Sequence, residues 1–143
     1  MPEQLPIYRS QQSAPGALIL FVDDERQISE LVQDILEGYG FRCVALTDSL
    51  QALALFKKLR GEIDALVTDQ NMPGLTGIQL IVEIRKENPE LPVVMCTGFS
   101  NIMSPEKARQ AGINEFLYKP FSPSQLVDAL RRAINSPKNP LAA

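Results

Sequence analysis

A chain of 143 residues, 45% of them hydrophobic, is long enough to bury a core as one domain. Its formal net charge is −3, and its 14 basic residues form no basic run, which argues against direct binding of nucleic acid. No stretch approaches the ~20 apolar residues of a membrane span, and the start of the chain lacks the regions of a signal peptide, so we expect neither membrane insertion nor secretion.

The cysteine and histidine content limits the chemistry that this chain can carry out. Cys43 and Cys96 stand in apolar runs with no partner at metal-ligand spacing, so we expect buried, reduced thiols and a cytoplasmic location. The chain contains no histidine, which removes the commonest general base and the usual carrier ring of a phosphorelay. Any phosphohistidine would therefore come from elsewhere.

Both ends of the chain read as tails or linkers. Residues 1–16 are rich in Gln, Pro and Ser, and residues 136–143 hold two prolines and no periodic pattern. We expect a single domain at 17–135. Within it, apolar runs alternate five times with helical segments, which predicts an α/β fold whose parallel sheet is covered by helices on both faces.

Strands and helices can be placed in chain order. The runs expected to form strands are 18–22, 41–46, 63–68, 91–96 and 115–118. The first helix is expected to end at Gly38 and Gly40, and the second to be capped by Asp48 or Ser49. The third follows loop 70–74 and Gly77 and ends at Asn88-Pro89. The fourth is short and polar, from Ser104-Pro105 through Ala111, and a capping box from Ser122 to Gln125 begins the fifth.

Polar residues follow the carboxyl ends of four strands. They are Asp23 and Asp24 after the first, Asp69 after the third, Thr97 after the fourth and Lys119 after the fifth. In an open parallel sheet the ligand crevice lies outside these ends, near the point where strand order reverses. Taken singly, each residue fits a helix cap, a turn or a solvated surface group. Their joint occurrence at separate strand ends favours a shared site.

The residue types indicate the chemistry of this site. Three carboxylates in one crevice repel one another unless a cation neutralises them, and Mg²⁺ suits oxygen ligands and often completes its shell with a phosphate. The ammonium of Lys119 can hold one phosphoryl oxygen, and the hydroxyl of Thr97 can donate a hydrogen bond to another. This set suits phosphoryl transfer to an aspartate.

These motifs resemble those of the receiver domain of two-component response regulators over nearly all of 17–135. The matching segments are Val22–Glu25, Thr68–Gly74 and Lys119–Phe121. The resemblance implies a single-domain, flavodoxin-like (βα)5 fold, a doubly wound parallel sheet with strand order 2-1-3-4-5. Segments 68–77 and 96–100 are similar to receivers attached to hybrid sensor histidine kinases.

The resemblance also implies a metal site and a phosphoacceptor. Asp24 and Asp69 would bind Mg²⁺ directly, together with the backbone carbonyl of Asn71, and Asp23 would bind it through water. Asp69 would attack a phosphohistidine in line and become the aspartyl phosphate. The donor would be a histidine kinase or a phosphotransfer protein.

The resemblance also implies residues that bind the phosphoryl group and residues that transmit phosphorylation to a partner. Lys119 would grip a phosphoryl oxygen, Thr97 would change rotamer to meet the phosphoryl group, and Phe116 stands where the family places a rotating aromatic residue, often tyrosine. The fourth helix, fifth strand and fifth helix would face a downstream protein target or form a phosphorylation-dependent dimer. Such a domain assists its own phosphorylation and dephosphorylation without being a turnover enzyme.

Three alternatives compete with this interpretation. A pseudo-receiver would dock partners without phosphorylation, which an intact set of site residues argues against. A flavodoxin-like cofactor carrier would want a neutral phosphate cradle after the first strand, where Asp23, Asp24 and Glu25 would repel a phosphate. A haloacid-dehalogenase-like phosphatase would want two aspartates two residues apart after its first strand, a motif that this sequence lacks there.

Overall fold

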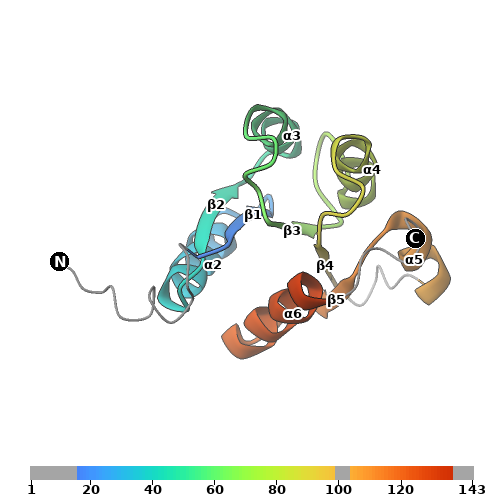
Figure 1. The fold of residues 1–143 in the computed structure, drawn as a ribbon. Coiled ribbons are helices and arrows are strands. Elements are labelled where there is room, and N and C mark those ends of the chain that lie inside the picture. The colour runs from blue at the N-terminus through green and yellow to red at the C-terminus, as the bar shows by residue number, and fades with distance from the viewer. Residues whose placement is uncertain (1–15, 99–103, 137–143) are drawn as a thin grey trace.

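The computed structural model describes residues 16–98 and 104–136. In these ranges five parallel strands form one sheet in the order β2-β1-β3-β4-β5 (Figure 1), so the predicted flavodoxin-like order is confirmed. The strands are β1 (Leu18–Val22), β2 (Arg42–Leu46), β3 (Ala65–Asp69), β4 (Val93–Thr97) and β5 (Glu115–Tyr118). The helices are α2 (Arg26–Gly38), α3 (Ser49–Lys58), α4 (Gly77–Glu87), α5 (Pro105–Ala111) and α6 (Pro123–Asn135). Nearly all of both predicted tails, and residues 99 and 100, lie outside the described ranges, and the domain limits stay predictions.

Two hydrophobic cores lie on the two faces of the sheet. Helices α2 and α6 cover one face, and α3 and α4 cover the other, with α5 in contact with α4 (Figure 1). Alternate residues of β1 divide between the cores, so that Ile19 and Phe21 pack toward α2 and α6 while Leu20 and Val22 pack toward α3 and α4. Every residue of β1, β3 and β4 is buried, as expected for inner strands with helices on both faces.

Side chains cap three of the helices as the sequence predicts. Asp48, rather than Ser49, caps α3, and its carboxylate accepts two backbone hydrogen bonds at 2.8 and 3.2 Å. Ser104 caps α5. Ser122 and Gln125 form the predicted capping box at α6. These caps satisfy N–H groups that have no partner within their helices.

The strands β3 and β4 begin two residues later than the sequence predicts, and β2 begins one residue later. Before β3, the carboxylate of Asp64 accepts a hydrogen bond from the backbone N–H of Leu18 at 2.7 Å, so a side chain replaces a ladder partner there. Before β4, Pro92 has no N–H to give to a ladder. Both strands also end one residue later, so their polar terminal residues belong to the strands themselves.

Cys43 and Cys96 are buried free thiols, as predicted. Within the described residues, no helix has the length and apolar character needed to cross a membrane.

Candidate functional site

Three carboxylates from two adjacent strands lie together at the carboxyl edge of the sheet. Asp23 and Asp24 follow β1 directly, and Asp69 is the last residue of the neighbouring strand β3. One carboxylate oxygen from each residue lies within 4.8 Å of the others. The structure therefore brings together the three acidic residues that the sequence singles out, beside the strand where the order of connections reverses.

Lys119, which directly follows β5, extends into this cluster from the other half of the sheet. Its Nζ lies 2.8 Å from Asp23 Oδ2 and 3.3 Å from Asp69 Oδ2. A fourth carboxylate, that of Glu25, lies 3.4 Å from the same nitrogen, a contact that the sequence did not predict. One ammonium is therefore shared by three carboxylates.

The two aspartates after β1 have very different surroundings. Asp23 is fully buried, and its Oδ1 accepts a hydrogen bond from the backbone N–H of Glu25 at 2.9 Å while its Oδ2 receives Lys119. Asp24 is exposed, and its carboxylate makes no hydrogen bond or ion pair within the part of the chain that the structure describes. Asp24 is therefore the carboxylate of this cluster that is free to take a ligand from solvent.

The cluster carries more negative charge than its lysine can neutralise. Burial raises the pKa of Asp69 above its ordinary value, the charge of Lys119 lowers it, and the charge of Asp23 raises it again. Burial would lower the pKa of Lys119, but hydrogen bonds and charges from Asp23 and then Asp69 outweigh it and raise that pKa. A hard divalent cation among the three carboxylates would relieve this repulsion, and an all-oxygen donor set suits Mg²⁺.

The loop after β3 is held by contacts that the sequence did not predict. Ser49 of α3 is buried, donates a hydrogen bond to the carbonyl of Pro73 at 3.0 Å and accepts one from the N–H of Leu75 at 2.8 Å. At the other end of the loop, a Cβ on Gly77 would clash with the carbonyl of Asp69. Buried serine and close-packed glycine thus fix the backbone next to Asp69, whereas Asn71 is an exposed residue of this loop.

A second capping box anchors the start of α4. Thr76 accepts a hydrogen bond from the N–H of Gln79, and the Gln79 side chain accepts one from the N–H of Thr76. Met72, a residue of the loop itself, is 8% exposed and packs into the core beneath α3 and α4. The predicted loop 70–74 is therefore followed by a fixed helix start and anchored by a buried side chain.

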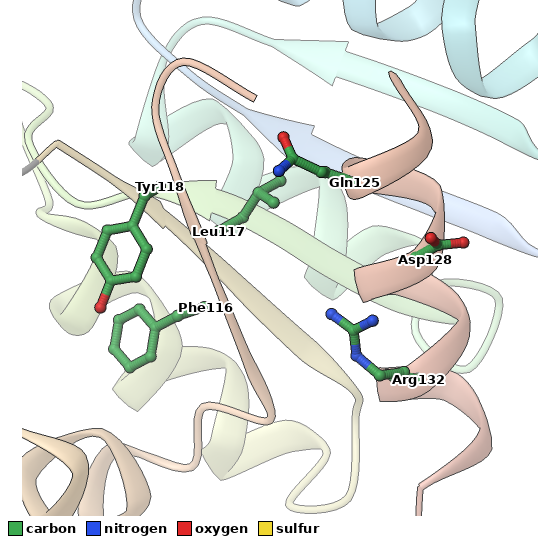
Figure 2. A pocket seen from close by; sticks show the side chains of 6 residues that line it. All are labelled: Phe116, Leu117, Tyr118, Gln125, Asp128 and Arg132. Atoms are coloured by element: carbon green, nitrogen blue, oxygen red, sulfur yellow. The ribbon is translucent and has the colours of Figure 1, made fainter. Parts of the chain in front are cut away.

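Thr97 and Phe116 lie on the half of the sheet toward β5. Thr97 is the last residue of β4, its side chain is buried, and its hydroxyl donates to the carbonyl of Gly98 at 3.3 Å. Phe116 stacks on Tyr118, with ring centroids 6.1 Å apart and planes inclined by 11°. Figure 2 shows both rings on one side of β5, with Leu117 between β5 and α6. Tyr118 was not singled out in the sequence, although residues two apart in a strand share a face.

Fold and site together define a class of protein: a flavodoxin-like domain whose crevice presents clustered carboxylates and a lysine. The family model described as "Response regulator receiver domain" matches residues 19–131, so the chain belongs to the receiver-domain family of two-component systems. The predicted family is confirmed, and receiver domains are signalling modules. The chain is 39% identical over 115 residues to the chemotaxis protein CheY-3 of Vibrio cholerae serotype O1, covering 78% of this chain and 87% of that protein.

Solved structures support the same family. A response regulator receiver domain protein from Clostridium thermocellum is similar with a TM-score of 0.79 and 33% identity, covering 83% of this chain and 94% of that one. The receiver domain of the sensor histidine kinase PA1611 from Pseudomonas aeruginosa, solved with a magnesium ion coordinated in its active-site cleft, matches with a TM-score of 0.74 and 30% identity, covering 85% and 99%. That ion agrees with the donor set found in this chain.

Proposed function

We propose that this chain is a phosphorylation switch in which Asp69 accepts a phosphoryl group from the phosphohistidine of a histidine kinase or phosphotransfer protein. The observation that carries the proposal is the convergence of Asp23, Asp24 and Asp69 within 4.8 Å, with Lys119 Nζ 3.3 Å from the proposed acceptor. Phosphoryl transfer to an aspartate needs a carboxylate nucleophile, a group of oxygen ligands that can bind a cation, and a fixed ammonium.

The proposed step forms one bond and breaks another. A carboxylate oxygen of Asp69 bonds to phosphorus in line with the leaving imidazole, and the phosphorus–nitrogen bond breaks with its electron pair going to that ring. Lys119 stabilises the charge on the phosphoryl oxygens as a point charge. The side chain of Asp69 is 10% exposed, so one side of its carboxylate stays accessible to a donor.

Magnesium is the proposed cofactor. Asp24 and Asp69 would hold it directly, with the backbone carbonyl of Asn71, and Asp23 would do so through water. When bound, it supplies positive charge to the phosphoryl oxygens. The buried Asp23, whose two oxygens already have partners, suits an indirect role, whereas the exposed Asp24 suits direct ligation.

An apolar groove beside the site supports docking of the phosphodonor. It lies between α2 and the turn from β5 into α6, encloses about 580 Å³ and is lined by Ile28, Leu31, Val32, Ile35, Lys119, Pro120, Phe121 and Pro123. Leu31 is 59% exposed, so the groove presents apolar surface to solvent. Because Lys119 lines both the groove and the acidic cluster, a partner seated there would present its phosphohistidine to Asp69.

The proposed output surface comprises α5, β5 and α6. Phosphorylation would favour a different arrangement of Thr97 and Phe116, and the change would reach a downstream target, or a second copy of the chain, through this surface. A hollow of about 280 Å³, lined by residues of β5 and α6, lies on this surface (Figure 2). A place within a hybrid sensor kinase stays a prediction, as does a cytoplasmic location. Docking without phosphorylation, a cofactor carrier and a phosphatase are not favoured.

Intact-mass spectrometry tests the proposal. The purified chain is mixed with Mg²⁺ and acetyl phosphate, and wild type should gain the mass of one phosphoryl group. Asp69→Asn should gain none, whereas Asp34→Asn, a matched change at an exposed position of α2, should behave as wild type. If wild type stays unmodified while its fold is intact, docking without phosphotransfer becomes the better account.

A further inference from the structure

Glu25 occupies a helix-capping position without capping the helix. It is the N-cap residue of α2, where short polar side chains are preferred because they accept hydrogen bonds from the first free N–H groups. The side chain of Glu25 makes no such hydrogen bond. Its side chain is 62% exposed, and its carboxylate lies 3.4 Å from Nζ of Lys119, the lysine of the acidic cluster.

Lys119 is held in the cluster without this contact. Asp23 binds the ammonium at 2.8 Å and Asp69 binds it at 3.3 Å, and their side chains are only 0% and 10% exposed. The contact with Glu25 is the longest of the three and the most exposed to solvent. Loss of the Glu25 charge should therefore leave the lysine in place while changing the charge that an arriving phosphoryl group meets.

We propose that Glu25 slows phosphorylation by competing with the phosphoryl group for Lys119, an inference that rests on the proposed function of Asp69. With acetyl phosphate, a carboxylate oxygen of Asp69 bonds to phosphorus, the bond from phosphorus to the bridging oxygen breaks, and acetate leaves with the electron pair. The phosphoryl oxygens then require the ammonium that Glu25 shares. Glu25 also places a negative charge beside the ammonium that would bind the doubly charged phosphoryl group, and so repels that group.

The charge of Glu25 can be removed without changing its size. Glu25→Gln should be phosphorylated by acetyl phosphate about three- to tenfold faster than wild type at low ionic strength, because a single unscreened charge at this range has an effect of that order. Glu30→Gln is the matched control, since it removes the same charge from an exposed position of the same helix. Its rate should equal that of wild type.

Salt dependence separates a charge effect from a structural one. In about 1 M KCl, where charges more than ~3 Å apart are largely screened, the advantage of Glu25→Gln should shrink toward onefold. Binding of the phosphoryl analogue trifluoroberyllate, measured by calorimetry with Mg²⁺ present, should be tighter in Glu25→Gln by a similar factor at low salt. This second readout does not depend on the reaction.

The outcomes are distinguishable. If wild type takes up no phosphoryl group, the proposed function of Asp69 fails. If wild type is phosphorylated but Glu25→Gln reacts and binds trifluoroberyllate like Glu30→Gln, competition for Lys119 is wrong while the function of Asp69 stands. An acceleration that persists unchanged in high salt also overturns the electrostatic mechanism.

Discussion

The two edges of the sheet use polar side chains in opposite ways. At the amino edge, polar side chains before β3 and β5 satisfy backbone N–H groups. The carboxylate of Asp64 accepts a hydrogen bond from the N–H of Leu18 at 2.7 Å, and the amide oxygen of Asn114 accepts one from the N–H of Val93 at 2.8 Å. At the carboxyl edge the carboxylates instead face one another around a single lysine.

Arg85 holds several backbone segments together at the amino edge. From the last turn of α4 its guanidinium donates hydrogen bonds to the carbonyls of Pro89, Leu91 and Gly112, and so joins the end of α4, the approach to β4 and the turn after α5. At the carboxyl edge Ser49 ties the loop after β3, but the lysine of the site binds carboxylates rather than backbone.

Charged side chains at the amino edge stabilise the fold, whereas the clustered carboxylates at the carboxyl edge are placed to bind a ligand. Polar groups that pair with the backbone of their own chain raise the free energy of unfolding. Like charges held close together lower it until a cation or an anion-binding event changes the balance. Removing a charged side chain should therefore lower the free energy of unfolding at the amino edge and raise it at the carboxyl edge.

The largest expected effect is at Arg85. Arg85→Met should lower the free energy of unfolding by about 3 kcal/mol, because it leaves three carbonyls without a donor that was charged and partly buried. Urea denaturation measures the loss, with Arg109→Met on the exposed side of α5 as the control. Phosphorylation of the folded variant should be unchanged. A loss no larger than that of the control would show that the amino edge is not held by Arg85.

Magnesium should affect the carboxyl edge selectively. At about a hundredfold excess over its dissociation constant, Mg²⁺ should raise the free energy of unfolding of wild type by about 2.7 kcal/mol. Asp24→Asn should lose most of this gain because it removes a directly ligating carboxylate, and Asp64→Ala should keep all of it. Equal gains in wild type and Asp24→Asn would contradict the proposed metal site.

Matched removal of one exposed carboxylate at each edge gives a smaller effect. Asp64→Ala should lower the free energy of unfolding by about 1 to 2 kcal/mol, since the N–H of Leu18 loses its acceptor. Asp24→Ala in metal-free buffer should raise it, since repulsion within the acidic cluster decreases. Urea denaturation with EDTA present compares the two. The same sign for both variants would mean that the edges do not differ.

The pH dependence of the carboxyl edge follows from the raised pKa of Asp69. An acid whose pKa is higher in the folded than in the unfolded state binds more protons when folded, so its contribution to stability falls as pH rises between those two values. In metal-free buffer, Asp69→Asn should therefore remove a stability loss that wild type shows above the ordinary pKa of an aspartate. Denaturation across a pH series measures the difference.

Much of the fold and the main site residues could be predicted from the sequence. Periodicity and glycine signals placed the βα units, and because carboxyl ends of parallel strands share one edge, Asp23, Asp69 and Lys119 could be assigned to a common crevice before any contact was known. The family resemblance then supplied the strand order. Such inference needs only which residue follows which strand.

What the sequence did not predict depends on contacts between distant segments. The hydrogen bonds of Ser49 to the loop after β3 join residues 24 and 26 apart in the chain. Gly77 must lack a Cβ because the backbone of Asp69 passes beside it, and no local pattern records that neighbour. Likewise, Glu25 reads as an ordinary acidic residue at a helix start until the position of Lys119 is known.

The two cysteines offer the finest test, because one lies near each edge. Cys43 pairs in register with Ile19 toward the amino edge, and Cys96 pairs with Asp69 at the carboxyl edge. Burial, followed by the charge of Glu37, raises the pKa of Cys43 to about 12, and burial likewise raises the pKa of Cys96, so neither thiol should react in the closed fold even at a pH where a free cysteine is ionised.

Alkylation by iodoacetamide must then follow local opening, and its rate reports how often each edge opens. Mg²⁺ binding should slow the labelling of Cys96, which lies beside the proposed ligand Asp69, and leave the labelling of Cys43 nearly unchanged. Peptide mass mapping after timed labelling gives both rates from one sample. An equal slowing at both cysteines would mean that the edges open together and that the sheet responds to the metal as one cooperative unit.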